Sequence, residues 1–327
     1  QSCPQDNIPT TIHSKHHDEI VGLMTNSRNQ IILSTLRNGA RSIAYATAGD
    51  PDGTPILFFY PAGGNRRFLI SLHNALSTKP IRFICVNRPG TGDTSCVERT
   101  GTASYVATAC DDAIAVLDDL GVDRAGLLCM CAGAAFAMVF ACRYPLRTSG
   151  KFVGIAPYVL PADCAECKAL ERFGALHCPL WLIGPLVGTV FGSFKCSLVS
   201  LPRSMILNSM RRSMSEEERH AFNSRLTREG DWIGDMKWMF EERTDAGADI
   251  SAVLSKGSDI GIDYGGIVGD VLLVHGDKDK TAPYAAAMWL EKQIPSANLT
   301  RLEDGTHEGA LFLLHTAVIK AIDSFVK

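Results

Sequence analysis

Cys131 lies at the centre of the stretch LCMCAGA (residues 128–134), between an apolar run and a run of small residues. Free cysteine is usually a small buried hydrophobe. A second chemistry is open to it here, because the chain pattern changes from strand to helix at this point. Unpaired N–H groups at a helix N-terminus favour an anion, and the thiolate is the nucleophilic form of cysteine. Cys131 is therefore either core packing or the nucleophile of an enzyme.

The segments around Cys131 predict an α/β protein. Continuous apolar runs are typical of strands buried on both faces, and five are present: PILFFYP, IRFICV, AGLLCM, KFVGIAP and DVLLVHG. ANLTRLED is also strand-like, and helical patterns occur in SYVATACDDAIAVLDDLG, AGAAFAMVFACRYP, YAAAMWLEKQI and, at the end, ALFLLHTAVIKAIDSFV. This alternation predicts a mostly parallel sheet with helices on both faces. Upstream, IILSTLRNG and RSIAYATAG are joined by Asn-Gly, which predicts a β-hairpin.

The composition is that of a globular protein: 327 residues, 46% hydrophobic, 20% charged and a net charge of −3. This slight acidity argues against nucleic acid as a partner. The eleven cysteines are odd in number, and none follows residue 196, which favours reduced thiols over a disulfide framework. Residues 1–30 form a polar leader without the apolar stretch of a signal peptide, and the apolar stretch 178–192 is too short to span a bilayer. We expect a cytoplasmic protein.

Four motifs occur in an order that resembles the α/β-hydrolase superfamily, over nearly all of the chain after residue 30. They are FFYPAGG (58–64), NRPGTGDTS (87–95), CMCAGA (129–134), and HGDKDKTAP (275–283) with LEDGTHEG (302–309). The resemblance implies an α/β-hydrolase fold, with a mostly parallel sheet of the eight-stranded type, helices on both faces and an inserted helical cap. The expected core comprises residues 31–157 and 266–327.

The expected cap comprises residues 158–265, where the strand–helix rhythm is interrupted by a region rich in Trp, Met and Phe. Part of this region, SEEERHAFNSRL, opens with a capping box between Ser215 and Glu218, which predicts a helix N-terminus. We expect the cap to be inserted between two strands of the sheet.

The resemblance places CMCAGA at the nucleophile elbow, whose usual pattern is G-x-S-x-G. Cys131 then replaces the serine at the apex of a sharp strand-to-helix turn. The positions two residues away must be small, and they hold Cys129 and Gly133. Cys129 makes this elbow bulkier than usual. Thiols on strands or apolar helix faces are expected to be buried and inert: Cys85, Cys110, Cys129 and Cys142.

The same resemblance supplies a histidine and an acid. His307 in EDGTHEG is the expected base, and His315, inside the predicted final helix, is expected to be structural. The family spacing G-x-x-D after the seventh strand selects Asp279 as the orienting acid, with Asp277 as the alternative. The expected triad is therefore Cys131, Asp279 and His307, in the family's chain order.

The oxyanion hole is expected to use the backbone N–H groups of Ala132 and Ala62. Tyr60-Pro61 occupies the place of the family's His-Gly pair. Proline has no N–H, but the expected donor is the next residue, so the hole can be retained. Tyr60 is expected either to contact substrate or to pack in the core. Large apolar side chains are expected to be shared between the cap's own core and a substrate pocket, for which the candidates are Tyr60, Trp181, Phe191, Trp232, Trp238 and Met239.

One cysteine pair has the spacing of zinc ligands. Cys164 and Cys167 form CAEC, with His177 and Cys178 nearby. Structural zinc usually takes two such pairs, so we expect no metal site and no cofactor.

A cysteine nucleophile predicts an acyl-thioester intermediate, from which transfer to an alcohol is favourable. The chain also resembles lactone-forming polyketide thioesterases, which implies a thioesterase or cyclase that releases an apolar, polyketide-like acyl chain as a lactone or an acid. The acyl chain would be that of a small-molecule substrate delivered as a carrier-protein or CoA thioester. One alternative is an esterase or lactone hydrolase, since the triad type also resembles that of dienelactone hydrolases. Another is a ligand-binding relative without catalysis, which a broken triad would favour.

Overall fold

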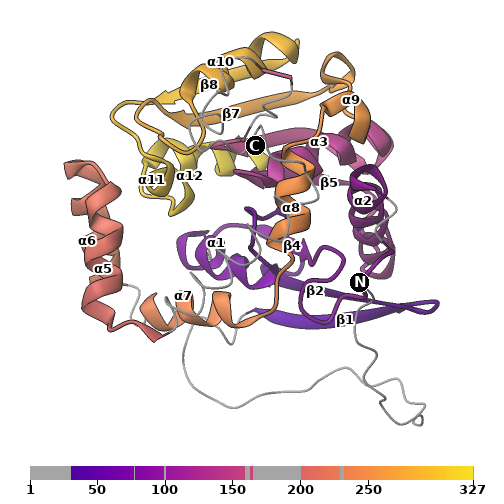
Figure 1. Cartoon of the computed structure of the whole chain (residues 1–327), viewed down its shortest axis with the longest axis horizontal. Helices are drawn as coiled ribbons and strands as arrows, with labels where there is room; N and C mark the ends of the chain where they lie inside the picture. Colours follow the sequence, from indigo (N-terminus) through magenta and orange to yellow (C-terminus); the bar gives the residue numbers. More distant parts are fainter. Residues whose placement is uncertain are drawn as a thin grey trace.

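The structure is a computed structural model that describes residues 31–76, 78–98, 101–158, 163–164, 200–228 and 232–326. Eight strands form one sheet in the order β1-β2-β4-β3-β5-β6-β7-β8 (Figure 1). Their bounds are β1 Ile32–Asn38, β2 Arg41–Gly49, β3 Thr54–Phe59, β4 Ile81–Val86, β5 Ala125–Met130, β6 Thr148–Ile155, β7 Asp270–Gly276 and β8 Ala297–Leu302. β2 pairs antiparallel with β1 and β4, and every other pair is parallel. The predicted mostly parallel sheet is confirmed.

The predicted hairpin is also confirmed. Asn38 pairs with Arg41 at the turn between β1 and β2. Gly39 has a φ of +59°, a left-handed conformation that glycine adopts without the steric cost of a Cβ.

Helices cover both faces of the sheet, because each strand of the core sends alternate side chains to opposite sides. α2 (Thr102–Asp119), α3 (Gly133–Arg143) and α10 (Tyr284–Gln293) pack with one set, which includes Leu57 and Leu127. α1 (Leu69–Leu76) and α12 (Thr316–Asp323) pack with the other, which includes Ile56 and Leu128. The parallel strands thus end between two helical layers, and their carboxyl ends carry the loops that hold the motifs.

Among the described residues, five α-helices lie between β6 and β7, within the range expected for the cap. They are α5 (Arg203–Ser213), α6 (Glu216–Arg228), α7 (Trp232–Glu241), α8 (Ala246–Val253) and α9 (Gly257–Ile260). The capping box at the start of α6 is present: Ser215 N donates to Glu218 Oε2 at 2.9 Å, and Glu218 N donates to Ser215 Oγ at 3.3 Å. In Figure 1, α5 and α6 lie beside α11 (His307–Leu311) and α12.

The prediction of one long final helix is wrong. α11 and α12 are separate, and Leu313 between them has a φ of +55°. His315 is consequently the N-cap residue of α12 and does not lie inside a helix. The apolar periodicity of this segment runs through the break, which is why the sequence pattern did not reveal it.

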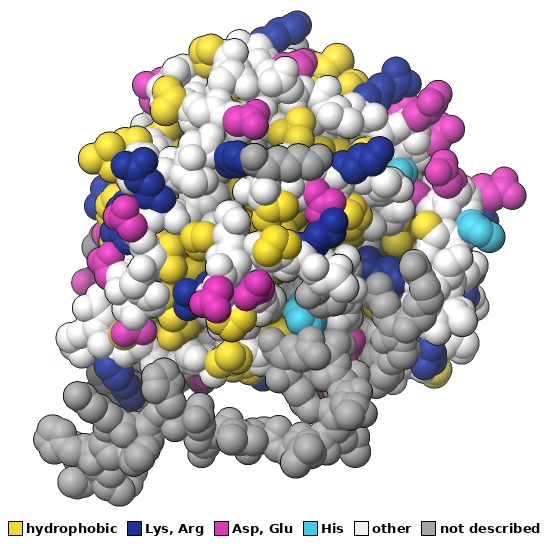
Figure 2. Space-filling view, turned by 180° about the vertical axis from the view of Figure 1, so that it is seen from behind, with side chains coloured by type: hydrophobic (Ala, Val, Ile, Leu, Met, Phe, Trp, Pro, Cys, Tyr) yellow, Lys and Arg dark blue, Asp and Glu magenta, His cyan; other side chains and the backbone are white. Residues whose placement is uncertain are grey.

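The surface is consistent with the small net charge. Figure 2 shows acidic, basic and hydrophobic side chains interspersed over the visible part of the back face. Within the described residues, no helix combines the length and the apolar character needed to cross a membrane.

Candidate active site

Cys131 is the apex of a tight turn between β5 and α3. Its φ is +48°, in the left-handed region that non-glycine residues rarely occupy. The loop after β6 holds this conformation: Cys131 N donates to Ile155 O at 3.1 Å, and Tyr158 N donates to Cys131 O at 3.0 Å. Such strain persists where the surroundings enforce it and is common at functional sites. The thiol is partly exposed.

Gly133 allows the turn to form close to the neighbouring strand. A Cβ on this residue would lie 2.1 Å from the carbonyl oxygen of Phe59, at the end of β3. Any other residue here would push α3 away from the sheet and move Cys131 with it.

Cys129, the bulky residue of the elbow, lies beside a glycine of the next strand. Cys129 pairs in register with Gly154 of β6, and a Cβ at Gly154 would lie 3.6 Å from the sulfur of Cys129. That distance is an ordinary van der Waals contact, so Cys129 packs beside Gly154 without crowding it. Cys129 itself is fully buried.

His307 and Asp279 are brought together by the loops that follow β8 and β7. His307 Nδ1 lies 2.6 Å from Asp279 Oδ2, and both side chains are buried. The two loops are joined through their backbones, because Asp277 N donates to Leu302 O at 3.1 Å and Lys278 N donates to Gly305 O at 3.0 Å. The geometry fits a histidine whose ring orientation is fixed by a carboxylate.

The other carboxylate oxygen of Asp279, Oδ1, also accepts hydrogen bonds. Thr281 N and Ala282 N donate to Oδ1 at 2.8 and 2.7 Å. Burial acts to raise the pKa of this carboxyl, but hydrogen bonds from His275 and His307 outweigh it, so the pKa lies well below the ordinary value. Asp279 is therefore ionised throughout the neutral range.

Cys131 and Asp279 act together on His307. Burial lowers the pKa of His307, whereas the charge of the Cys131 thiolate, the Asp279 carboxylate and hydrogen bonds to both raise it. The raising effects win, and the pKa lies well above its ordinary value. The raised pKa favours the imidazolium form of His307 beside the Asp279 carboxylate.

His275 is a residue of this site that the sequence reasoning missed. It is fully buried, and its Nε2 lies 2.8 Å from Ala282 O and 3.2 Å from Asp279 Oδ2. Both neighbours are acceptors, so Nε2 carries the proton. The HG dipeptide at the end of the apolar run of β7 was the available signal, since a histidine there must be buried.

The alternative acid and base are engaged elsewhere. Asp277 Oδ2 accepts from Arg301 Nη2 at 2.6 Å, on the outside of the loop. His315 Nε2 lies 2.7 Å from Glu218 Oε1. Both side chains are therefore engaged in the packing of the loops.

The loop after β3 holds Ala62, one of the two residues expected to form the oxyanion hole; the other, Ala132, follows Cys131 at the start of α3. Gly63 N donates to Asp249 Oδ2 on α8 at 3.0 Å, and Gly64 N donates to Pro61 O at 3.1 Å. In the described part of the chain, the N–H groups of Ala62 and Ala132 donate no hydrogen bond to protein. These two groups are available to an oxyanion.

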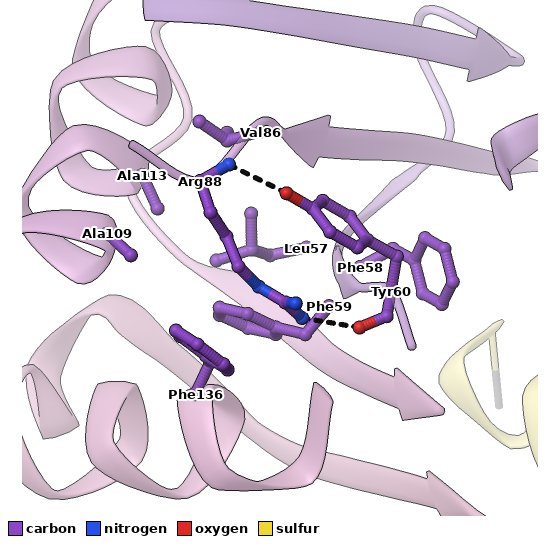
Figure 3. A pocket seen from close by; sticks show the side chains of 9 residues that line it. All are labelled: Leu57, Phe58, Phe59, Tyr60, Val86, Arg88, Ala109, Ala113 and Phe136. Atoms are coloured by element: carbon purple, nitrogen blue, oxygen red, sulfur yellow. Dashed lines mark hydrogen bonds between the residues drawn. The ribbon is translucent and has the colours of Figure 1, made fainter. Parts of the chain in front are cut away.

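Arg88 of the NRPG motif packs against this loop. Its guanidinium lies 4.1 Å from the ring of Tyr60 and 4.0 Å from that of Phe136 (Figure 3). It also pairs with Asp249 at 2.7 Å. Arg88 N donates to the hydroxyl of Tyr60 at 2.7 Å, and its side chain donates to the carbonyl of Tyr60. Tyr60 is 1% exposed, so of its two expected roles the structure favours packing. The small cavity here is not lined by Cys131, so it gives no substrate site.

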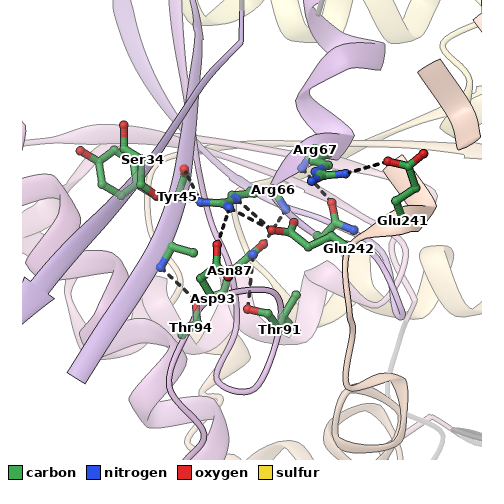
Figure 4. Close-up of polar contacts among 12 residues, drawn as sticks. Ser34, Tyr45, Arg66, Arg67, Asn87, Thr91, Asp93, Thr94, Glu241 and Glu242 are labelled. Carbon is green, nitrogen blue, oxygen red and sulfur yellow. Dashed lines mark hydrogen bonds and ion pairs between the residues drawn. The ribbon is translucent and has the colours of Figure 1, made fainter. Parts of the chain in front are cut away.

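The next three residues of the loop fix α7. Asn65 Nδ2 donates to Met239 O at 2.6 Å, and Arg67 Nη1 donates to Trp238 O at 2.9 Å. Arg66 is buried and pairs with Glu242 at 3.0 Å, just beyond the helix, while its backbone N donates to Asn87 Oδ1 (Figure 4). The loop after β3 is thus joined to α7 and α8 by polar contacts.

The sequence match decides the family. Residues 56–321 match the model of the alpha/beta hydrolase family. The chain belongs to this family. As a member, it is an enzyme of the hydrolase type. None of the curated proteins matches the chain.

Solved structures share the fold of this α/β hydrolase. An alpha/beta hydrolase fold protein from Chitinophaga pinensis has 18% identity and a TM-score of 0.60, over 90% of this chain and 95% of that one. An N-acyl homoserine lactone degrading enzyme has 19% identity and a TM-score of 0.58, over 90% and 100%. 2-Hydroxy-6-oxo-6-phenylhexa-2,4-dienoate hydrolase from Rhodococcus sp. strain RHA1 has 14% identity and a TM-score of 0.55, over 90% and 99%.

Of the other candidate pocket residues in this α/β hydrolase, those on α7 are mostly buried. Trp232 packs edge-on against Phe222 at 4.9 Å, and Met239 is 3% exposed. Trp238 is partly buried, with the guanidinium of Arg67 4.8 Å from its ring. Trp181 and Phe191 lie outside the described residues.

The remaining cysteines divide by environment. Burial raises the pKa of the thiols of Cys85, Cys110 and Cys129 far above their ordinary value, as expected of inert core thiols. Cys142 is only partly buried and bonds to the backbone of Asp263. Cys164 is buried, whereas Cys167, His177 and Cys178 lie outside the described residues. Within the described residues, no cluster of His, Cys, Asp or Glu is suited to a metal ion.

Proposed function

We propose that this α/β hydrolase is an acyl-transfer enzyme that works through a thioester on Cys131. The observation that carries the proposal is the position of Cys131 at the left-handed apex of the β5–α3 turn, where it raises the pKa of His307, which is itself paired with Asp279. Nucleophile, base and orienting acid in this relation are the recurrent apparatus of covalent acyl transfer.

In the first half-reaction the Cys131 thiolate attacks the acyl carbonyl carbon, and the carbonyl oxygen becomes an oxyanion. The N–H groups of Ala132 and Ala62 would stabilise that charge. Collapse of the intermediate breaks the bond to the leaving group, which takes a proton from the His307 imidazolium. The products are the free thiol or alcohol and an acyl-thioester on Cys131.

In the second half-reaction neutral His307 removes a proton from an acceptor hydroxyl. The resulting oxygen nucleophile attacks the thioester carbon, and Cys131 leaves as thiolate beside the regenerated imidazolium. Asp279 keeps the ring oriented in both steps. Water as the acceptor gives an acid, and a hydroxyl of the same acyl chain gives a lactone.

We propose ring closure as the favoured outcome, from a carrier-protein or CoA thioester of an apolar hydroxyacyl chain. A thioester retains enough free energy to form an ester. Holding the chain's own hydroxyl at the acyl carbon makes the step intramolecular, with effective molarities of about 10⁵ M or more in well-oriented cases. The aromatic-rich inserted segment is suited to fold such a chain and to exclude water.

The test is a product ratio measured with hydroxyacyl thioesters of several chain lengths and hydroxyl positions. The proposal predicts lactone as a major product with at least one substrate, made by the wild type and not by Cys131→Ala. Free hydroxy acid as the sole product throughout would contradict ring closure and leave hydrolysis.

Hydrolysis of esters or lactones is the second candidate. It is favoured by relatives of the same fold described as degrading N-acyl homoserine lactones and as a dienoate hydrolase. The same product analysis with lactone substrates separates the two, because a hydrolase would open the ring to the acid without a thioester donor.

A further inference from the structure

Glu218 of α6 is a buried carboxylate with four donors around it. Oε1 accepts from Thr306 N at 2.7 Å and from His315 Nε2 at 2.7 Å. Oε2 accepts from Ser215 N at 2.9 Å and from Thr306 Oγ1 at 2.8 Å. An ionised carboxylate has about four acceptor sites, so Glu218 is saturated. Burial alone would raise its pKa, but these hydrogen bonds win and lower it to about 2.

Thr306, which donates two of these hydrogen bonds, is the residue immediately before His307. It is the N-cap of α11, and its hydroxyl accepts from Gly309 N at 3.1 Å. Glu218 therefore fixes both the backbone and the side chain of the cap residue from which the His307 helix starts. Gly309 permits this approach, because a Cβ there would lie 1.8 Å from Glu218 Oε1.

The rest of the inner face of α6 packs against the same segment, which runs from Thr306 to His315. Phe222 and Arg225, four and seven residues after Glu218, lie on the same side of the helix. The Phe222 ring lies 6.5 Å from that of Phe312, and Arg225 donates to the carbonyl of Phe312. α6 is thus docked along the chain from Thr306 to His315, the stretch that carries the base.

We propose that Glu218 is a positioning residue that holds His307 in its working orientation, so that an inserted helix forms part of the support of the active site. The inference rests on the proposed function for the role of His307 as the base. It assigns to Glu218 a task separate from closing the capping box of its own helix.

The informative variant is Glu218→Gln, which keeps the shape of the side chain. The amide nitrogen cannot accept a hydrogen bond, so it would face donors where an oxygen now accepts. The adjacent Glu217→Gln is the matched control, since Glu217 is exposed on the same helix. A 1 Å displacement of a catalytic group can cost about 100-fold in rate, so we expect kcat to fall about 10- to 100-fold with little change in KM.

Two readouts separate positioning from mere stability, both taken at a temperature where each variant is folded. One is the pH profile of Cys131 alkylation by iodoacetamide, which depends on the Cys131–His307 pair. The other is the downfield proton resonance of His307 Nδ1–H against Asp279. We expect Glu218→Gln to alter both and Glu217→Gln to alter neither. Wild-type profiles in Glu218→Gln, with only the unfolding temperature lowered, would overturn the inference.

If Glu218→Gln does not fold, Thr306→Val tests the same contact. It keeps the size of the side chain and removes the hydroxyl that donates to Glu218. We expect a smaller shift of the same two readouts, and an unchanged pair of readouts would overturn the inference. Failure of the proposed function is distinguishable, because it would appear as full turnover by Cys131→Ala, whereas the His307 resonance would still report on Glu218.

Discussion

Gly276 and Gly305 touch, backbone against backbone, at the carboxyl end of the sheet. A Cβ on Gly276 would lie 2.1 Å from the carbonyl oxygen of Gly305, and a Cβ on Gly305 would lie 3.1 Å from the Cα of Gly276. The first residue ends β7, before the loop of Asp279, and the second precedes Thr306 and His307. This contact lets two separate loops meet closely enough for the 2.6 Å bond between acid and histidine.

Gly276→Ala should therefore separate the two loops. Overpacking of a closely fitted site costs about 1–3 kcal/mol, so we expect a lower free energy of unfolding together with a loss of most activity. Gly265→Ala is the control, because its nearest neighbour would be a side-chain oxygen at an ordinary 3.6 Å. Denaturant unfolding and turnover of the two variants give the comparison. Equal activity in both would mean that the loops tolerate separation.

The acid assignment predicts different effects for the two aspartates of the same loop. In Asp279→Asn an amide replaces the oxygen that accepts from His307 Nδ1, which favours the wrong ring tautomer. We expect kcat to fall by about 10² to 10⁴-fold. Asp277→Asn weakens only the exposed pair with Arg301 and should stay near wild type. Steady-state kinetics of the two variants tests this prediction. A large loss of kcat in Asp277→Asn, with Asp279→Asn near wild type, would assign the acid to Asp277.

Cys131→Ala should lower the pKa of His307, because it removes a charge and a hydrogen bond that raise it. The pKa should fall toward the ordinary value of 6.5, held up only by Asp279. A raised histidine pKa stabilises the fold fully below pH 6.5 and loses that effect as pH rises through the raised value. NMR titration of the imidazole measures the shift, with exposed His220 as reference resonance. An unchanged His307 titration would show that the thiol and ring do not interact.

The lowered pKa of Glu218 predicts that the folded protein loses stability at acid pH. Its pKa is about 2 in the folded chain against an ordinary 4.5, so its stabilising effect is full above pH 4.5 and is lost as pH falls toward 2. The difference in unfolding free energy between wild type and Glu218→Gln should therefore shrink over that interval. Chemical denaturation at a series of pH values tests this, with Glu217→Gln as the control. A difference that is constant with pH would contradict the assignment.

The sequence predicted the elements and motif turns well because each depends on local pattern. The hairpin at Asn38, the buried strands and the capping box at Ser215 are all set by neighbouring residues. The pairing of Cys129 with Gly154 could not be predicted, since it depends on the register between two strands. The same holds for Glu218, whose partner Thr306 is 88 residues away. The break at Leu313 is hidden because the apolar period continues through it.

The most direct test of the account is intact-mass analysis of the enzyme mixed briefly with an acyl thioester, followed by peptide mapping. The wild type should gain the mass of one acyl group, located on the peptide that contains Cys131, and His307→Ala should form the adduct far more slowly. Cys131→Ala should form none and should not turn over. An acyl group found on another residue, or turnover that persists in Cys131→Ala, would contradict the claim that this cysteine is the nucleophile.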